Sequence, residues 1–287
     1  MALTLHRYDD VDGFLRATAP FLAEREAEHN LIFGISSWLR RNPALVDEPP
    51  AFMAVSDSGG TIVAASIQTP PNNPVLSVVD QLDAVDLIAD AYGTNVPGVL
   101  GSPEAAARFA ARWIERSGGR AAVAMAERIF RLERVIPPRA TPGAWRLLEP
   151  GDRDLVADWV IAFVSEATPE EPPSLADARD AIDRWIRQEG TFGYLWEDGG
   201  EPVSLAAARG ETPNGIRIGP VYTPPEHRGH GYASAVTAAA SQDQLDRGRH
   251  FVFLFTDLSN PTSNKIYQAI GYERVCDVDM YRFETDA

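Results

Sequence analysis

The chain has 287 residues, a formal net charge of −15 at pH 7, 45% hydrophobic residues and a single cysteine, Cys276. So acidic a chain lacks the basic face that nucleic-acid binding usually needs, and we expect no nucleic-acid partner. One cysteine cannot form an intramolecular disulfide, the N-terminus is charged too early for a signal peptide, and no apolar stretch approaches the ~18 residues of a membrane span. We therefore expect a cytoplasmic protein that contacts no membrane, and about one domain per ~150 residues predicts two domains.

The first half of the chain alternates strand and helix patterns. Ser58-Gly-Gly60 lies between two apolar runs and predicts a hairpin turn. The turn from Gly98 to Glu104 then opens a helical run. The expected elements are a strand at 3–7, helices at 11–28 and 30–41, strands at 52–55 and 62–68, apolar runs at 76–79 and 82–92, a helix at 105–114 and closing strands within 121–135.

Proline and glycine interrupt regular structure at 136–143, so we expect a linker at 137–143 between domains at 1–136 and 144–287. In the second half, Asp198-Gly-Gly200 predicts a hairpin. The expected elements are a strand at 144–148, helices at 152–166 and 175–188, strands at 192–196, 203–208 and 216–222, a helix after 226–234, a strand at 251–256, a short helix and a final strand at 273–283. The first half follows the same plan, so we expect a tandem arrangement.

Residues 226–234 read Glu-His-Arg-Gly-His-Gly-Tyr-Ala-Ser and join an apolar strand to an Ala-rich helix. Glycines such as Gly229 and Gly231 let backbone N–H groups crowd around an anion, and a helix N-terminus adds partial positive charge. Arg228 supplies a cation at the same turn. The pattern is typical of a pyrophosphate pocket, although an ordinary loop ahead of a surface helix has the same local signals.

A second segment, 256–272, follows a strand that is apolar at nearly every position. Asn260 is a plausible N-cap and Pro261 fits the first helical turn. Asn260, Asn264 and Tyr267 are spaced at i, i+4 and i+7, which predicts that they share one face of this helix.

Together these residues resemble the GNAT superfamily of N-acetyltransferases. The loop from Arg228 to Ala233 fits the family's phosphate loop, Arg/Gln-x-x-Gly-x-Gly/Ala, and the segment Asn260, Asn264, Tyr267, Gly-Tyr272 fits its second cofactor segment. The resemblance covers about residues 144–287. It implies an α/β fold with a mixed (α+β) sheet and, with the repeated plan, two GNAT-like acyl-CoA N-acyltransferase domains in tandem.

In the first half the phosphate loop is degenerate, because no arginine stands three residues before a Gly-x-Gly/Ala unit and Pro103 removes a backbone donor at the 98–104 turn. We expect this half to be a structural partner or a wall of the substrate cleft, not a second acetyl-CoA site.

The resemblance implies acetyl-CoA as the acyl donor, with the backbone at the end of the 216–222 strand facing the pantetheine arm and the loop holding the pyrophosphate. For Asn260 a simple capping role is equally open. The implied acetyl-CoA contacts are Val221, Tyr222, Thr223, Arg228, Gly229, His230, Gly231, Tyr232, Ala233, Ser234, Asn260 and Asn264.

Acetyl transfer to an amine leaves a thiolate that needs a proton or a hydrogen bond. A model thiol titrates near ~8.5 and a phenol near ~10, so a tyrosine stays protonated at neutral pH. Tyr267 occupies the position that the resemblance assigns to this general acid. The alternative is a tyrosine that only packs in the core.

No general base is obvious. We expect Glu166, Glu170 and Glu171 in the loop between the first two helices of this half, a region that commonly borders the acceptor pocket in this family. One of them could bind the substrate ammonium or accept its proton through water; a solvated acidic loop is the other interpretation. The five histidines are scattered and no Cys/His cluster has metal-ligand spacing, so we expect no metal.

The leading hypothesis is therefore an N-acetyltransferase that transfers an acetyl group from acetyl-CoA to a primary amine of a small molecule or amino-acid-like metabolite by direct attack. Two alternatives stay open: an acyltransferase with another acyl-CoA or aminoacyl donor, and a regulatory module that binds acyl-CoA without turnover. The sequence does not select the acceptor or the oligomeric state.

Overall fold

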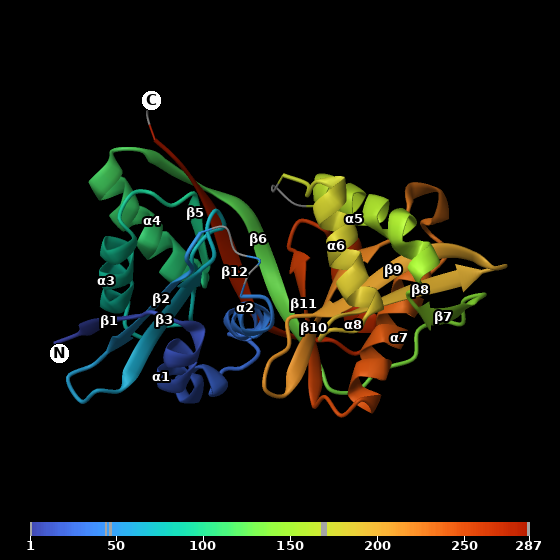
Figure 1. The fold of residues 1–287 in the computed structure, drawn as a ribbon, viewed down its shortest axis with the longest axis horizontal. Coiled ribbons are helices and arrows are strands. Elements are labelled where there is room, and N and C mark those ends of the chain that lie inside the picture. The colour runs from blue at the N-terminus through green and yellow to red at the C-terminus, as the bar shows by residue number, and fades with distance from the viewer. Residues whose placement is uncertain (1, 44, 46–47, 168–170, 286–287) are drawn as a thin grey trace. The chain divides into compact units, whose positions relative to one another are not determined.

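A computed structural model describes residues 2–43, 45, 48–167 and 171–285. The chain divides by its internal contacts into two units (Figure 1). Unit 1 comprises Met1–Ile129 together with Val275–Ala287, and unit 2 comprises Phe130–Arg274. Each unit is an α/β assembly of strands covered by helices.

The strands of unit 1 lie in the order β1-β2-β3-β4-β5-β12, where β12 (Glu273–Glu284) is the last strand of the chain. Neighbouring strands pair antiparallel except β4 and β5, which are parallel. The elements are β1 (Thr4–Tyr8), α1 (Val11–Ala23), α2 (Asn30–Arg41), β2 (Ala51–Ser56), β3 (Ile62–Gln68), β4 (Val75–Leu76), α3 (Asp83–Tyr92), β5 (Gly98–Gly101), α4 (Pro103–Ser117) and β6 (Arg120–Leu132).

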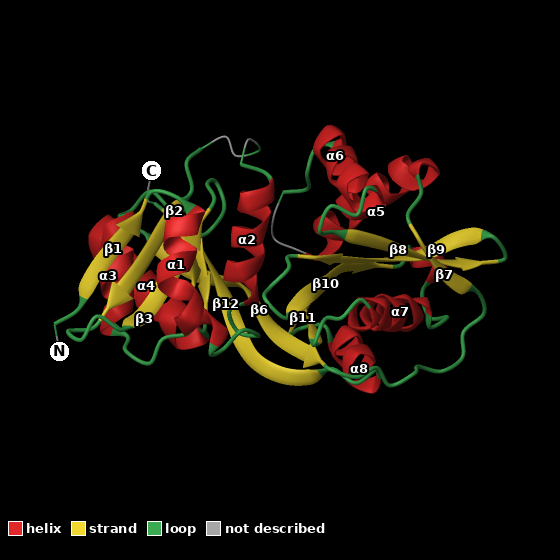
Figure 2. Cartoon of the chain, turned by 60° about the horizontal axis from the view of Figure 1, so that its bottom comes forward, coloured by secondary structure: helices red, strands yellow, loops and turns green. Residues whose placement is uncertain are grey.

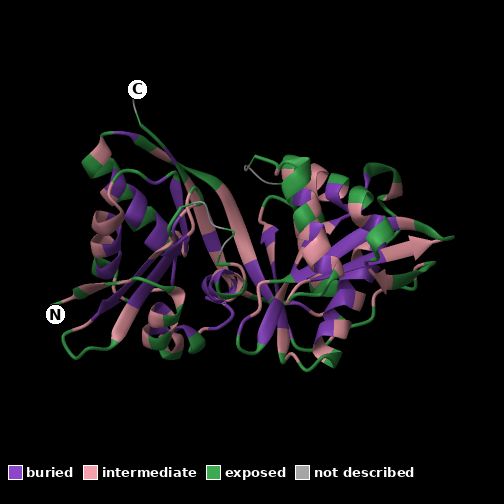
Figure 3. Ribbon diagram, in the orientation of Figure 1, coloured by how far each residue is buried: buried purple, intermediate pink, exposed green. Residues whose placement is uncertain are grey.

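The two faces of this sheet are covered by different helix pairs. Side chains of α1 and α2 pack with Ala65 and Ile67 of β3, whereas α3 and α4 pack with Ala64 of the same strand and with Val99. Successive residues of a strand point to opposite faces, so Ala64 and Ala65 belong to separate cores. Figure 2 shows the helices around the strands, and Figure 3 shows the buried residues running along them.

Unit 2 contains strands in the order β11-β10-β9-β8-β7, with β6 beside β11. Its β10 and β11 are parallel and β7 to β10 are antiparallel. The elements are β7 (Ala144–Leu147), α5 (Arg153–Ala167), α6 (Leu175–Ile186), β8 (Phe192–Asp198), β9 (Glu201–Arg209), β10 (Gly215–Tyr222), α7 (Tyr232–Asp246), β11 (Phe251–Asp257), α8 (Pro261–Ala269) and β12 (Glu273–Glu284).

The sheet of unit 2 is covered in the same way. Leu205 of β9 packs with α5 and α6, and its neighbour Ala206 packs with Val236 of α7 and Ile270. Both predicted Gly-Gly hairpins are confirmed, since β2–β3 and β8–β9 pair antiparallel across them. The predicted 11–28 helix is too long: α1 ends at Ala23, three residues after its internal Pro20.

Strands β6 and β12 belong to both units, because the unit boundaries fall inside them. The predicted division at 137–143 kept 275–287 with the second half, whereas the structure groups these residues with the first. The reason is pairing and burial: Tyr281 of β12 lies opposite Val99 of β5, and Phe283 stacks on Trp113 with ring centroids 4.4 Å apart. The last strand of the chain thus completes the sheet and the core of unit 1.

The element order shows which loop of unit 1 corresponds to the glycine-containing loop of unit 2. In unit 2 that loop joins β10 to α7, and in unit 1 the loop at the same place in the element order joins β4 to α3. The prediction that placed it at 98–104 is therefore wrong; that turn leads from β5 into α4. Residues 77–82 contain no glycine, and the Val78 amide donates to Nε2 of the buried His29 at 3.0 Å.

Candidate active site

Strands β10 and β11 separate part-way along their length. Their parallel register ends at the pair Arg217–Phe253. Beyond it β10 stays paired with β9 as far as Tyr222–Leu205, after a bulge. Within the described residues, the last part of β10 therefore has no ladder partner on its β11 side. An opening between two parallel strands exposes backbone donors and acceptors to an elongated ligand.

The loop after β10 ends at the N-terminus of α7. Gly229 and Gly231 have φ angles of 84° and 88°, a region that side chains other than glycine rarely adopt. Gly231 is the N-cap of α7 and has no side chain that could accept a hydrogen bond from the first turn. The first amides of a helix have no partner within it, so those of Tyr232, Ala233 and Ser234 are available to an anion.

Tyr232 anchors this helix start. Its ring is buried, its hydroxyl donates to Asp198 Oδ2 at 2.5 Å, and the ring of His230 stacks on it with centroids 5.5 Å apart. The hydrogen bond to the Asp198 carboxylate raises the pKa of Tyr232. The first turn of α7 is thus tied to the β8–β9 hairpin, which restricts the loop before it.

Arg228 lies at the centre of a second network. Its Nε donates to the Thr223 carbonyl at 2.9 Å, its Nη2 donates to Glu166 Oε2 at 2.6 Å, and its guanidinium lies 5.8 Å from the centre of the Tyr222 ring. The Tyr222 hydroxyl also donates to Glu166, at 2.9 Å. The end of β10, the loop and the last turn of α5 therefore meet at one carboxylate.

This network defines the charge state of Glu166. The hydrogen bond from Arg228, followed by that from Tyr222, lowers the pKa of Glu166. The group is an anion at neutral pH and accepts a proton poorly while both donors are in place. Glu171 is exposed in the segment before α6. Glu170 lies outside the described residues.

The two asparagines of α8 make internal bonds. Asn260 is the N-cap, and its Oδ1 accepts from the Ser263 amide at 3.1 Å. Asn264 accepts from Thr256 Oγ1 at 2.7 Å and donates to the carbonyls of Asp257 and Asn260. These bonds tie the end of β11 to the first turn of α8. The predicted contacts of both asparagines with acetyl-CoA stay a prediction.

Tyr267 is partly buried against the core under α7 and α8. Its ring meets that of Tyr272 edge-on at 6.0 Å. Burial raises the pKa of Tyr267 to about 12, against a smaller opposing effect of a hydrogen bond with Ser263. The phenol is therefore protonated throughout the physiological pH range and can act as a hydrogen-bond donor.

The remaining predicted contacts lie at the end of β10. Val221 is half-buried and packs on the same core as Tyr267. The Thr223 hydroxyl is 2.8 Å from that of Ser204. Among the described residues, no group of histidine, cysteine and carboxylate side chains could hold a metal ion, and no helix there is long and apolar enough to cross a membrane.

Residues 156–272 match the model of the Acetyltransferase (GNAT) family. They form a GNAT-family domain. The match begins inside α5 and ends just before β12, so it includes the opening of the sheet, the loop at 228–234 and α8. No curated protein sequence matches the chain.

Solved structures share the fold along nearly the whole chain. A Drosophila protein has a TM-score of 0.69 at 14% identity, with 99% of each chain covered. The GCN5-related N-acetyltransferase from Sphaerobacter thermophilus has a TM-score of 0.62 at 17% identity, covering 98% of this chain and 95% of that one. A tandem GNAT protein from the clavulanic acid biosynthesis pathway has a TM-score of 0.54 at 12% identity, covering 99% and 98%.

Sequence reasoning missed several residues that shape the site of the GNAT domain. Asp198 was interpreted only as part of a hairpin turn, yet its carboxylate holds Tyr232. Ser204, in the middle of β9, donates to the Tyr222 carbonyl at 3.2 Å. Thr141 lies against Gly231, where a Cβ would come within 2.9 Å of its Oγ1. No local pattern marks these contacts, since each joins segments far apart in the sequence.

Proposed function

We propose that this protein is an N-acetyltransferase that transfers the acetyl group of acetyl-CoA to a primary amine of a small molecule or amino-acid-like metabolite. One observation carries the proposal: the strand that separates from its parallel neighbour after Arg217 is joined by the loop at 223–231 to the start of α7, whose N-cap is a glycine. An elongated donor with a diphosphate at one end and a thioester at the other fits an open strand edge that ends at helix amides.

The chain's own groups suit such a donor. The backbone of Val221, Tyr222 and Thr223 faces the pantetheine arm and the thioester carbonyl. The amides between Arg228 and Ser234 hold the diphosphate. Glycine at 229 and 231 supports this assignment, because the backbone there has the left-handed conformation that brings loop amides toward one point.

Tyr267 is the proposed partner of the departing sulfur. A thiol titrates near ~8.5, about 3.5 units below a phenol of pKa about 12. Complete proton transfer from Tyr267 to the sulfur is therefore unfavourable. We infer that Tyr267 acts by donating a hydrogen bond that strengthens as negative charge develops on the sulfur. The amine attacks the thioester carbonyl directly and loses its proton to solvent.

Glu166 is proposed to attract the substrate ammonium. Its lowered pKa makes it a permanent anion rather than a base, and its side chain is 44% exposed. Exposed Glu171 is the second candidate, and Glu170 stays a candidate on the sequence alone. The charge of −15 supports a cationic small-molecule substrate over nucleic acid. A cytoplasmic location also stays part of the proposal.

The proposal is tested by mixing the protein with acetyl-CoA and a panel of amines and measuring release of free CoA and the mass of the product. We expect Tyr267→Phe to lose most of the turnover while it still binds CoA. Tyr92→Phe is the matched control, because Tyr92 is a tyrosine of unit 1 whose hydroxyl contacts only Ser66 among the bonds described. Equal turnover in Tyr267→Phe would remove that residue from the mechanism.

The same experiment separates the alternatives. Turnover only with longer acyl-CoA or aminoacyl donors would identify a different donor. Tight CoA binding without turnover for any amine would identify a binding module. Absence of CoA binding by calorimetry at millimolar concentration would refute the proposal as a whole.

A further inference from the structure

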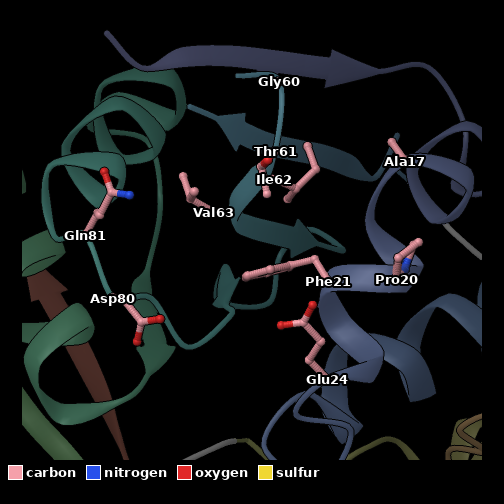
Figure 4. Close-up of a pocket in the computed structure, with 10 residues that line it drawn as sticks. All are labelled: Ala17, Pro20, Phe21, Glu24, Gly60, Thr61, Ile62, Val63, Asp80 and Gln81. Carbon is pink, nitrogen blue, oxygen red and sulfur yellow. The ribbon is translucent and has the colours of Figure 1, made fainter. Parts of the chain in front are cut away.

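Unit 1 contains a pocket of its own, with a volume of about 370 Å³. It lies between the last turns of α1, the start of β3 and the loop that joins β4 to α3 (Figure 4). This volume is within the ~300–1,000 Å³ that small-molecule sites usually occupy. One wall is the loop that, by element order, stands where unit 2 has the loop that joins β10 to α7.

The loop of unit 1 is unsuited to an anion. It has no glycine between 77 and 82, and the Val78 amide is already used by His29 Nε2. The amides of Ala84 and Val85 are used as well, by the carbonyls of Gln81 and Leu82. Acidic residues follow in the first turn of α3. A phosphate would therefore meet bonded amides and negative charge, the reverse of the arrangement at α7.

The lining instead carries net negative charge. Asp80 forms an ion pair with Arg25, at 3.1 Å, so its charge is largely balanced. Glu24, at the end of α1, makes no side-chain hydrogen bond or ion pair with the described residues. Figure 4 shows the Glu24 carboxylate beside the Phe21 ring, at the open space that Asp80 borders. One unbalanced carboxylate is thus offered to a ligand.

The rest of the lining divides into an apolar wall and two neutral polar groups. Phe21, Ile62 and Val63 provide the apolar wall. The Thr61 hydroxyl and the Gln81 amide lie at the same pocket, and neither side chain bonds to the described part of the chain. A ligand that fills this space therefore buries an apolar body and places one positive group and one polar group at its edge.

We propose that this pocket is a second small-molecule site that binds an amphipathic monocation, a primary ammonium on a compact apolar body. The ammonium lies at Glu24 and the body against Phe21 and Val63. The proposed ligand is a cation, whereas the acetyl-CoA proposed to bind unit 2 is an anion. Binding of the cation to unit 1 does not require that the protein transfer acetyl groups.

The test titrates the full-length ¹⁵N-labelled protein, without acetyl-CoA, with three probes that share a 2-phenylethyl body: 2-phenylethylamine, the neutral 2-phenylethanol and the anionic 3-phenylpropanoate. We expect the amine to shift the amides of residues 60–63 and 80–81 and to bind about ten-fold more tightly than the alcohol, the size of one charged hydrogen bond. Shifts confined to unit 2, or equal affinity for alcohol and amine, would overturn the proposal.

Three variants locate the interaction. Glu24→Gln keeps the shape of the pocket and should weaken amine binding about ten-fold, and Ala17→Trp should fill the pocket and abolish binding. Asp83→Asn is the matched control: Asp83 is an acid of the neighbouring helix start, 86% exposed and outside the pocket lining. Unchanged affinity in Glu24→Gln refutes the assignment even if Ala17→Trp fails to fold.

Discussion

Arg228 and Glu166 form an ion pair of 2.6 Å that joins the loop before α7 to the last turn of α5. Arg228 is the cation of the proposed diphosphate site, and Glu166 is the anion proposed for the substrate amine. In the structure each of these side chains is therefore the ion-pair partner of the other. A ligand that binds either one must compete with that partner. The pair is half-exposed, so its own contribution to stability is small.

Glu166→Gln should therefore bind CoA more tightly. The substitution frees Arg228 for the diphosphate and removes a nearby negative charge, and we expect the CoA dissociation constant to fall by about two- to five-fold, the range of an exposed ion pair. Isothermal titration calorimetry measures this dissociation constant. Glu171→Gln is the control, an exposed acid of the following segment. Weaker CoA binding in Glu166→Gln would show that the pair positions Arg228 instead of competing for it.

Gly231→Ala tests the start of α7. A side chain at φ 88° is strained, and the new Cβ would come within 2.9 Å of Thr141 Oγ1. We expect the free energy of unfolding to decrease by about 1–2 kcal/mol. We also expect the affinity for CoA to decrease by about ten-fold or more, because the loop amides would move away from the proposed position of the diphosphate. Thermal unfolding and calorimetry measure the two effects.

Gly151→Ala is the matched control for that variant, since no atom lies within 4 Å of its added Cβ and its φ is not in the left-handed region. If Gly231→Ala unfolded earlier but bound CoA normally, the loop would be a structural turn and not a binding element.

We expect His29 to make the stability of unit 1 depend on pH. Burial lowers the pKa of His29, and the neutral ring accepts from the Val78 amide through Nε2 while Nδ1 contacts the Leu22 carbonyl at 2.9 Å. Below about pH 6.5 the unfolded chain takes up a proton that the folded ring resists. The stabilisation is therefore complete above that pH and decreases as the pH falls below it.

We expect the temperature at the midpoint of thermal unfolding to decrease as the pH is lowered from about 7.5 to about 5.5. The decrease should be smaller in His29→Gln, which has no titrating group at this position. His250→Gln, in unit 2, is the control. An identical pH dependence in the wild type and His29→Gln would assign the effect to other groups.

Phe283→Ala tests the grouping of β12 with unit 1. The ring stacks on Trp113 and lies 6.1 Å from Phe109, both on α4. Removing it should cost about 3 kcal/mol, as for other large-to-small core changes. Hydrogen exchange should then speed up in α3 and α4, although the substitution is near the C-terminus. Faster exchange in α5 and α6 instead would contradict the grouping.

Much of unit 2 was predictable because its signals are local. The Gly-Gly pair after Asp198 specifies a hairpin through the backbone conformations that glycine permits. Asn260 and Pro261 mark the start of α8 within two residues. The loop at 228–234 was found for the same reason: strand, glycine turn and helix start are adjacent in the chain.

The sequence by itself determined the order of strands and helices in the second half of the chain, both Gly-Gly hairpins and the position of the GNAT loop, since each depends on residues within a few positions of one another. Only the tertiary structure decided that Glu166 meets Arg228 across 62 residues, that His29 takes the Val78 amide across 49, and that the last strand pairs with β5. Such contacts depend on how buried faces pack and which backbone groups then need partners, and no short stretch of sequence contains that information.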